Sequence, residues 1–534
     1  MNKFLKLVMS LTMMCFITTM HAQAPVLGAT ANFAVFSTNG AVTNTGLSLI
    51  TGDVGTNNGG LTGFGNIDGV MHNGDGATNA AAVSLTLLYN QLNSAIPTNF
   101  PAALLGNGQT LNPGVHFIPQ AATLNGVLTL DGGGDPNAQF IFQIQGALSS
   151  GAAAEVILTN GTQACNVFWK VEPTGVNLAT NTIMKGTIVA NNAAIILNTG
   201  VKLEGRALST TGAVSLAGAT VTKPIGCGSV VLTGPVAPAL NTVSCFALFT
   251  GTGSVTNAGI SMVTGDIGTN SGLVTGFQAA NVNGTIHPGP NTVTALTAAE
   301  LGVVKTYLAA LPTDIPLLYP ADFGNGLVLT PHTYHLNAAT VLNGTVYLNA
   351  QGNANAVFVI KINGALSTST YAEVILQNGA QAKNVYWVVS GGAISLNDYT
   401  NFKGTLIGDA AVNLNTGVTV AGSVLTTGGA FDTASVNVQM TPGCTSLGTN
   451  DTAVVTQEAK LYPNPFSTVL NVTVEGVDNG SNLKLYDASG SKVLDVRLSN
   501  KTTSLPINLP AGVYFYQLTG KNGEQQGGKL ISKP

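Results

Sequence analysis

Acidic and imidazole side chains recur as matched pairs in the two halves of the chain, and paired carboxylates are the groups that hydrolyse glycosidic bonds. The pairs are Asp53 and Asp266, His72 and His287, and Glu155 and Glu373. The aspartates stand in "TGDVGT" and "TGDIGT", where Asp usually forms a turn. The histidines lie beside Gly-rich stretches without repeated acidic company, and the glutamates are expected to cap strands or make polar surface contacts. We therefore predict no catalytic residues, and a polysaccharide-acting β-solenoid enzyme is the less favoured alternative.

Cysteine spacing indicates disulfides, not a metal centre. Cys15 lies within a predicted signal peptide, which leaves Cys165, Cys227, Cys245 and Cys444. Four cysteines allow three connectivities, and the sequence does not choose between them, although a Cys245–Cys444 bridge would tie the ends of the second half. The spacing contains no CxxC element, so zinc is not expected. No metal and no cofactor is predicted.

Spaced leucines with small or polar neighbours form a short period inside each half. Their separations are 24, 30, 19 and 19 in the first half, starting at Leu124, and 24, 30, 18 and 17 in the second, which starts at Leu342 and ends at Phe431 in place of a leucine. A short strand that recurs at one coil's spacing is typical of a β-solenoid. Because side chains alternate along a strand, the leucines should point inward and their neighbours outward.

The outward neighbours form a charge-poor surface in each half. In the first half it comprises Thr43, Thr123, Asn125, Ala147, Ser149, Asn177, Ala179, Asn198, Ser215 and Ala217. In the second half it comprises Thr256, Asn343, Ala365, Ser367, Ser395, Asn397, Asn413, Asn415, Ala430 and Asp432. Ile196, Val341 and Asp432 interrupt the pattern of small neutral groups. A slip of one residue in the alternation would turn every one of these side chains inward.

The whole chain is organised as a tandem repeat followed by a smaller module. "NFAVFSTNGAVTNTG" from Asn32 matches "CFALFTGTGSVTNAG" from Cys245, and "AEVILTNG" from Ala154 matches "AEVILQNG" from Ala372. We predict domains at 24–228 and 240–445, a linker at 446–457 and a third domain at 458–534. Residues 1–22 have the positive start and apolar run of a signal peptide.

One helix per repeat is expected to cover the strands that are apolar on both faces. "VFWKV" (167–171) and "VYWVV" (385–389) are such strands. The first helix (78–96) places on one stripe Ala81, Leu85, Leu88 and Leu92, and the second (294–311) does so with Leu301, Val304, Leu308 and Leu311. The predicted fold is mainly β, with two tandem right-handed discontinuous β-solenoids, a long α-helix alongside each, and a small C-terminal β-sandwich.

Composition limits the partners. Only 8% of the 534 residues are charged, and the net charge is −4. No basic field is present to hold a phosphate backbone, so nucleic acid is not expected. After the signal peptide we find no run of about 18 apolar residues, and we predict an exported protein without a transmembrane segment.

Together the repeated blocks resemble the secreted microbial ice-binding (antifreeze) proteins. The blocks are "TANFAVF", "TGDVGTN", "FIFQI", "NVFWKV" and "LNTGV…GRALSTTGAVSL", and they cover about 24–228 and again 240–445. The resemblance implies a discontinuous β-solenoid that binds ice through one flat sheet. It therefore assigns ice as the ligand of the outward surfaces, with thermal hysteresis and inhibition of ice recrystallisation as the activity.

The tail resembles a type IX secretion sorting domain. "LYPNPFSTVLNVTV", "LKLYDASGSKV" and "LPAGVYFYQLTGKNGEQQGGKLISK" carry this likeness. It implies export by the type IX machinery, followed by release or attachment to the cell surface. A surface adhesin for ice or glycans is the alternative function, although the tryptophans that a glycan site would use, Trp169 and Trp387, fall on strands expected to be buried.

Overall fold

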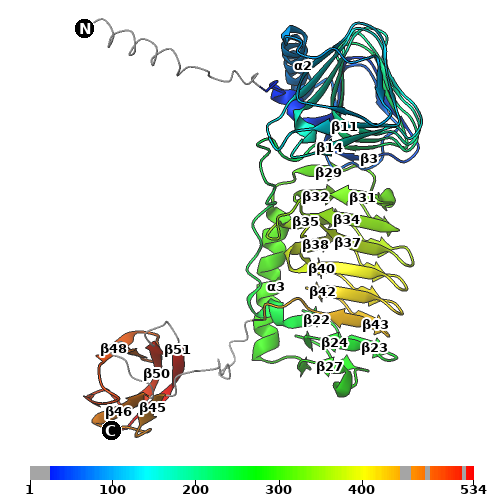
Figure 1. Cartoon of the computed structure of the whole chain (residues 1–534). Helices are drawn as coiled ribbons and strands as arrows, with labels where there is room; N and C mark the ends of the chain where they lie inside the picture. Colours follow the sequence, from blue (N-terminus) through cyan, green and yellow to red (C-terminus); the bar gives the residue numbers. More distant parts are fainter. Residues whose placement is uncertain (1–23, 445–458, 475–480, 520–524, 534) are drawn as a thin grey trace, which may run out of the picture. The chain divides into compact units, whose positions relative to one another are not determined.

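A computed structural model describes residues 24–444, 459–474, 481–519 and 525–533. The predicted signal peptide and linker lie outside these residues. The chain forms two compact units, 1–445 and 446–534. The first unit contains two solenoids built from parallel strands, and the second contains antiparallel sheets (Figure 1). The predicted fold class, mainly β with two tandem solenoids, is confirmed, and the predicted domain boundaries stay a prediction.

The first solenoid has one exposed eight-stranded sheet, which we call ladder sheet 1. All its strands are parallel neighbours, in the order β5 (Leu61–Thr62), β2 (Val42–Thr45), β20 (Val214–Ala217), β18 (Ile195–Leu197), β16 (Val176–Leu178), β13 (Leu148–Ser150), β10 (Ala122–Asn125) and β7 (Leu104–Gly106). Because these strands are only two to four residues long, each coil contributes one or two outward side chains to this sheet.

The other two faces of this solenoid are formed by a single 13-stranded sheet. Its strands are β1 (Phe33–Asn39), β3 (Leu49–Thr51), β4 (Asp53–Asn58), β6 (Met71–Asn73), β8 (Gln109–Leu111), β9 (Gly114–Ile118), β11 (Val127–Asp131), β12 (Phe140–Ile144), β14 (Glu155–Thr159), β15 (Val167–Val171), β17 (Ile183–Ala190), β19 (Lys202–Ser209) and β21 (Thr220–Thr222). Strand β17 belongs to both faces and turns the corner at Gly186, whose φ is +103°. A Cβ there would lie 2.5 Å from the carbonyl oxygen of Val167, so glycine is required.

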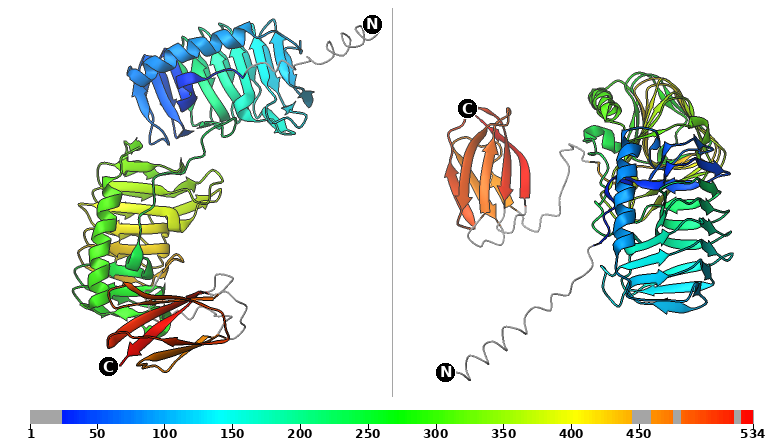
Figure 2. Two further views of the ribbon diagram at one scale, coloured as in Figure 1. Left: turned by 90° about the vertical axis from the view of Figure 1, so that its left-hand side faces the viewer. Right: turned by 90° about the horizontal axis from the view of Figure 1, so that it is seen from above.

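The stacking order of coils is discontinuous in sequence. Strand β1 pairs with β19 and β2 pairs with β20, so the first coils stack on the last. Helix α2 (Gly76–Ser94) then carries the chain from the β5 end to the β7 end of the stack (Figure 2). Its 19 residues span about 28 Å, close to the roughly 33 Å that eight stacked strands occupy.

Helix α2 covers one face of the solenoid. Asp75 caps its N-terminus, because the Asp75 side chain accepts a hydrogen bond from the backbone N–H of Thr78. The predicted stripe of Ala81, Leu85, Leu88 and Leu92 is fully buried against apolar side chains of β1, β12, β15, β17 and β19. On the inner side of the same sheet, Trp169 stacks on Phe142 with ring centroids 3.8 Å apart. Both faces of "VFWKV" are therefore buried, as predicted.

The second solenoid repeats this plan with ladder sheet 2. The ladder strands are, in order, β26 (Val274–Thr275), β23 (Val255–Ala258), β43 (Phe431–Ala434), β41 (Val412–Leu414), β39 (Ile394–Leu396), β36 (Leu366–Thr368), β33 (Thr340–Asn343) and β30 (Phe323–Gly324). Its 15-stranded sheet comprises β22 (Phe246–Thr250), β24 (Met262–Thr264), β25 (Asp266–Thr269), β27 (Val282–Asn283), β28 (Ile286–His287), β29 (Ile315–Leu317), β31 (Leu327–Leu329), β32 (Thr333–Leu336), β34 (Thr345–Asn349), β35 (Phe358–Asn363), β37 (Glu373–Gln377), β38 (Val385–Ser390), β40 (Asn401–Gly408), β42 (Thr419–Thr426) and β44 (Asn437–Gln439).

Helix α3 (Thr292–Ala310) lies along the second solenoid and buries Leu301, Val304 and Leu308. Leu311, predicted on the same stripe, follows the last helical residue and is partly buried. By length and composition alone, α3 is long and apolar enough to cross a membrane. This corrects the expectation that no segment after the signal peptide meets that criterion. Its apolar stripe packs on the sheet, as expected for a helix that covers a core.

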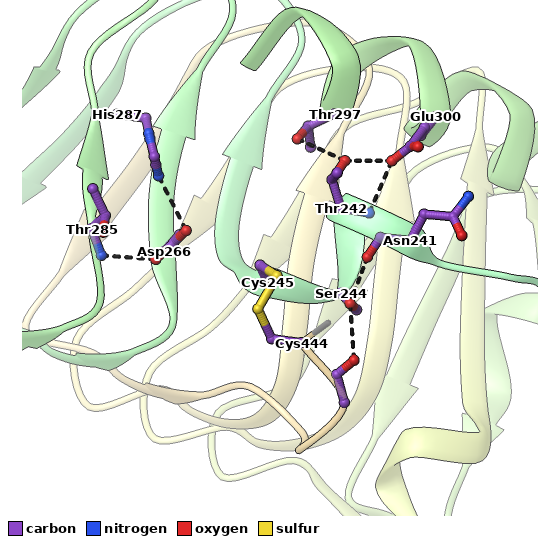
Figure 3. Close-up of a disulfide and its surroundings, with 11 residues drawn as sticks. Asn241, Thr242, Ser244, Cys245, Asp266, Thr285, His287, Thr297, Glu300 and Cys444 are labelled. Atoms are coloured by element: carbon purple, nitrogen blue, oxygen red, sulfur yellow. Dashed lines mark hydrogen bonds and ion pairs between the residues drawn. A yellow bond between two sulfur atoms is a disulfide. The ribbon is translucent and has the colours of Figure 1, made fainter. Parts of the chain in front are cut away.

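Two disulfides are formed, Cys165–Cys227 and Cys245–Cys444. The second joins the start of the second solenoid to the segment after its last strand. It is the bridge that the sequence suggested as a tie between the ends of the second half. Close to it, Thr242 donates hydrogen bonds from its backbone N–H and its hydroxyl to Glu300 of α3 (Figure 3). The first residues of the second solenoid are thus fixed both to the segment after β44 and to the helix.

The C-terminal unit consists of two antiparallel sheets that share one apolar core. The first sheet contains β45 (Ala459–Tyr462), β46 (Val469–Val474) and β49 (Thr502–Pro506). The second contains β48 (Lys492–Leu498), β47 (Ser481–Tyr486), β50 (Gly512–Thr519) and β51 (Gln525–Ser532). This is the predicted small β-sandwich.

Candidate functional site

Ladder sheet 1 presents one row of outward side chains in strand register. The leucines on either side of this row, such as Leu124 and Leu197, are fully buried. The predicted alternation is therefore confirmed. From one edge of the sheet to the other the row, which we call row 1, is Thr62, Thr43, Ser215, Ile196, Asn177, Ser149, Thr123 and Leu104. Adjacent members stand on neighbouring strands, so they repeat at about 4.8 Å.

Ladder sheet 2 carries an equivalent row 2. Its members in register are Thr275, Thr256, Asp432, Asn413, Ser395, Ser367 and Val341. Position by position, Ser215 of row 1 corresponds to Asp432, Ile196 to Asn413 and Thr123 to Val341. The two rows have the same geometry and differ in polarity.

The remaining predicted residues flank these rows. Asn125 and Asn343 are the last residues of their ladder strands, Ala217 ends β20 opposite Thr45, and the others lie one residue outside a strand. All are exposed or half-buried; those outside a strand are Ala147, Ala179, Asn198, Ala365, Asn397, Asn415 and Ala430. The structure thus brings every predicted residue to its ladder sheet or the margin of it.

Hydrogen bonds between neighbouring coils fix the polar groups of the rows. The Thr43 hydroxyl donates to Ser215 Oγ (3.2 Å), and Thr123 Oγ1 lies 3.1 Å from Ser149 Oγ. In row 2 the Thr256 hydroxyl donates to the carboxylate of Asp432. At the margin, the Asn198 amide donates to Asn177 Oδ1 (2.8 Å). The side chains are consequently held in place before any ligand arrives.

Charge separates the ladder sheets from the other exposed face of the first solenoid. Asp432 is the single charged member of rows 1 and 2. The face formed by β11, β14 and the first halves of β17 and β19 carries Glu155 and Lys202, and an ion pair of 2.7 Å between Lys185 and Glu204. The third face is covered by α2. Among the three faces of this solenoid, ladder sheet 1 is therefore the one that no described segment covers and whose row contains no charged side chain.

Sequence reasoning missed three members of the rows. Thr62 and Thr275 come from two-residue strands, and Leu104 from the first coil after α2, where its side chain is 55% exposed. The "LT" and "VT" pairs repeat the alternation of "VTN" nineteen residues earlier, which is the signal that would have identified the threonines.

The paired aspartates and histidines meet one another, which corrects the expectation that the histidines lack acidic company. His72 Nε2 lies 3.7 Å from Asp53 and His287 Nε2 3.1 Å from Asp266. Each Asp also accepts a backbone N–H from the neighbouring coil, that of Val70 or Thr285 (2.8 Å each). Each histidine ring packs beside a phenylalanine at the start of its solenoid. These contacts tie coils together.

The glutamate pair shows no such clustering. Glu155 and Glu373 begin strands β14 and β37, and Glu373 accepts a hydrogen bond of 3.0 Å from Asn401 of the adjacent strand. Among the residues that the structure describes, no three His, Cys, Asp or Glu side chains gather where a metal ion could be held. The ladder sheets present hydroxyl, amide and methyl groups, together with the carboxylate of Asp432 in row 2.

Comparison with known proteins gives two matches to family models. Residues 36–222 and 249–437 each match the ice-binding-like family, and residues 460–533 match the secretion system C-terminal sorting domain. The sorting domain indicates secretion by the type IX route to the cell surface or beyond it.

Similar proteins include both solved structures and curated sequences. The crystal structure of an ice-binding protein from an Antarctic Flavobacteriaceae bacterium is 67% identical, covers 79% of this chain and all of its own, and has a TM-score of 0.78. An ice-binding protein of Nostoc sp. is 39% identical over 36% of this chain and 72% of its own length. Ice-binding protein 1 of Shewanella frigidimarina is 30% identical over 35% of this chain and 24% of its own length. The chain therefore belongs to the ice-binding-like family and contains two tandem copies of its domain, followed by a sorting domain.

Proposed function

We propose that the protein adsorbs to ice crystals through ladder sheets 1 and 2, with rows 1 and 2 at the centre of each contact. The observation that carries this proposal is the in-register row of mostly small side chains, only one of them charged, on a sheet that no described part of the solenoids covers. Adsorbed protein restrains growth of the crystal, which gives thermal hysteresis and inhibits ice recrystallisation.

Physical chemistry explains why such a row suits ice. Methyl groups favour an ordered water layer above them, and hydroxyl and amide groups hold that layer by hydrogen bonds. Each contact is weak, but the coils fix all of them relative to one another, so the ordering cost is met during folding and not during binding. Two solenoids in one chain raise the effective affinity further where both ladder sheets reach the same crystal.

We infer that the protein is not an enzyme and that its partners are ice and the type IX export machinery. The adhesin alternative receives less support, because Trp169 and Trp387 are fully buried. Two exposed tyrosines of the second solenoid, Tyr371 and Tyr399, stack on each other with centroids 5.0 Å apart, which covers their facing rings. After export, release and surface attachment are both compatible with an ice-binding role.

A face-specific substitution tests the proposal. Asn177→Tyr places a bulky ring at the middle of row 1, while Thr129→Tyr places the same ring on the face formed by β11 and β14. The second solenoid has Tyr347 where the first has Thr129, so the control is a residue this fold already accepts. We expect Asn177→Tyr combined with Ser395→Tyr in row 2 to lower partition into growing ice and thermal hysteresis, and Thr129→Tyr to change neither.

Two results would refute the proposal. Failure of the unaltered protein to enter ice would reject the function, and full activity of the Asn177→Tyr, Ser395→Tyr protein would reject the ladder sheets as its site.

A further inference from the structure

The first solenoid touches the second through a set of hydrogen bonds, and we call this contact the junction. The Asn66 amide donates to the carbonyl oxygen of Tyr319 (2.8 Å), and Asn66 Oδ1 accepts from the Tyr319 N–H (2.9 Å). Asp68 accepts from the hydroxyl groups of Thr330 (2.8 Å) and Tyr334. The junction therefore joins the segment between β5 and β6 of the first solenoid to the β29–β31 end of the second.

Because the two solenoids are repeats, each carries its own copy of both surfaces that meet at the junction. One copy of each is used there, and the other copy lies elsewhere on the chain. Surface A is at the β7–β8 end of the first solenoid, and its Phe100, Gly108, Asn112 and His116 match Ile315, Gly326, Thr330 and Tyr334. Surface B is along β24 and β27 of the second solenoid, and its Met262, Asn281 and Asn283 match Leu49, Asn66 and Asp68.

Surface A has the local geometry of its counterpart at the junction. The Tyr334 hydroxyl donates to the carbonyl oxygen of Thr330 (2.6 Å), and His116 Nε2 lies 3.1 Å from the carbonyl oxygen of Asn112. A polar ring atom thus stands at the same place in both solenoids. In the second solenoid that place faces Asp68 of the first.

An apolar contact of the junction is open on surfaces A and B. A Cβ built on Gly326 would lie 3.8 Å from Leu49 Cδ1, whereas one built on Gly108 would meet no atom within 4 Å. Leu49 is half-buried, while Met262, its counterpart on surface B, is 52% exposed. The chain therefore presents both halves of this contact a second time without bringing them together.

Surface A is apolar and exposed. Phe100 is 73% exposed, whereas Ile315, its counterpart at the junction, is 5% exposed. Ile96 and Leu104, close to Phe100 in the chain, are also exposed, and residues 76–130 include no Asp, Glu, Lys or Arg. Solenoid proteins ordinarily end in coils with a polar outer face, and exposed apolar surfaces mark sites of interaction. An uncharged apolar end accordingly indicates a contact with another molecule.

We propose that copies of this chain associate head to tail, with surface A of one copy bound to surface B of the next. Met262 then packs beside Gly108, as leucine packs beside glycine at the junction. Asn283 takes the place of the aspartate and faces Asn112 and His116. An amide both donates and accepts hydrogen bonds, so it suits these neutral partners.

The contact joins two different surfaces, so every copy added leaves one A and one B surface unused, and association continues into open chains. It is expected to be weaker than the junction. The segment that carries Tyr319 is shorter in the first solenoid, which removes its backbone hydrogen bonds. The covalent link also gives the junction an effective concentration on the order of millimolar, which separate copies lack. This inference does not rest on adsorption to ice.

Sedimentation equilibrium on the exported chain, from residue 23 onward, tests the proposal. We expect the weight-average mass to be that of a monomer at about 5 µM and to rise by at least half by about 500 µM, still below the effective concentration at the junction. Phe100→Glu on surface A and Met262→Glu on surface B each place a charge at an exposed position and should abolish the rise. Val83→Glu places the same charge on the exposed side of α2, where Val83 is 65% exposed, and is the control.

A mixture of the two variants distinguishes a head-to-tail contact from a symmetric one. The Phe100→Glu chain retains surface B and the Met262→Glu chain retains surface A, so the mixture should form dimers and nothing larger. Melting midpoints equal to that of the unaltered chain show that the variants are folded.

Loss of the rise in each single variant, its retention in Val83→Glu and recovery of dimers in the mixture support the proposal. The proposal is overturned by an unaltered chain that stays monomeric over the whole range, or by a rise that persists in either single variant. Loss of the rise in Val83→Glu would show unspecific apolar association, and a mixture that stays monomeric would show that surfaces A and B do not bind each other. Both results reject it as well.

Discussion

Exchange of matched row residues between the two solenoids tests the ladder sheets most sharply. Asp432 stands in the middle of row 2, between Thr256 and Asn413, and its counterpart in row 1 is Ser215. A serine hydroxyl both donates and accepts, as each water of an ice-like layer does, whereas an ionised carboxylate only accepts. We therefore expect Asp432→Ser to strengthen adsorption by ladder sheet 2 and Ser215→Asp to weaken adsorption by ladder sheet 1.

The size of the change in adsorption free energy follows from the hydrogen bonds to water that the Asp432 carboxylate loses at an ice surface. Asp432 is exposed, and one of its oxygens already accepts from Thr256, so only part of its hydration is lost at an ice surface. Hydrogen bonds to charged groups contribute about 1.5–3 kcal/mol, and the partial loss here is on the order of 1–2 kcal/mol. That corresponds to roughly a 5- to 30-fold change in the adsorption constant.

The assay requires one solenoid to report at a time. Asn177→Tyr blocks row 1 when Asp432→Ser is measured, and Ser395→Tyr blocks row 2 when Ser215→Asp is measured. The measured quantity is the protein concentration that gives half-maximal inhibition of ice recrystallisation, with circular dichroism as the check on folding. If Asp432→Ser leaves that concentration unchanged or raises it in a folded protein, charge in the row does not limit adsorption and the reasoning fails.

Three further predictions concern the rows, the disulfide and the junction. Ile196→Asn should raise the thermal hysteresis produced by the first solenoid, and Asn413→Ile should lower that produced by the second. Thermal hysteresis equal to that of the unaltered protein in both variants would contradict the assigned rows. Replacing Cys245 and Cys444 by serine opens a loop of 199 residues and should cost roughly 5 kcal/mol of unfolding free energy, seen as a lower urea midpoint. Burial raises the pKa of Asp68, so its contribution to stability is full below the ordinary pKa of 3.8 and is lost as pH rises through the raised value. Asp68→Asn should remove that dependence of stability on pH. If the melting temperatures of the unaltered protein and of Asp68→Asn change equally between pH 4 and pH 7, the argument is wrong.

The sequence predicts those features that depend on the period within one coil. Leu148 and Ser149 illustrate this, since alternation in a short strand assigns one side chain to the core and the next to the surface. The stripe of Leu85 and Leu88 predicts the helix face in the same way. Local periodicity was sufficient here because neither assignment depends on which coil lies next to which.

Contacts between coils were harder to predict. His72 and Asp53 are 19 residues apart, which equals one coil of the leucine series, yet without the stacking order this spacing has no structural meaning. Thr62 depends on the same information, because the coil that contains it stacks on β2 at the end of the sheet. The junction was beyond prediction, since Asp68 and Tyr334 meet across 266 residues.

The arrangement of the first solenoid explains why one sheet is available to a crystalline ligand. Buried leucines such as Leu197 keep the coils in register, so the outward positions repeat at a fixed interval whatever side chains occupy them. Helix α2 takes one face, and the ion pair of Lys185 and Glu204 marks a second face as charged. The fold therefore sets the spacing of the outward positions, and we propose that the side chains of row 1 and its margin decide what this surface binds. This separation is why residues can be exchanged between the rows without risk to the core, and why the differences at Ser215 and Asp432 should appear in ice adsorption and not in stability.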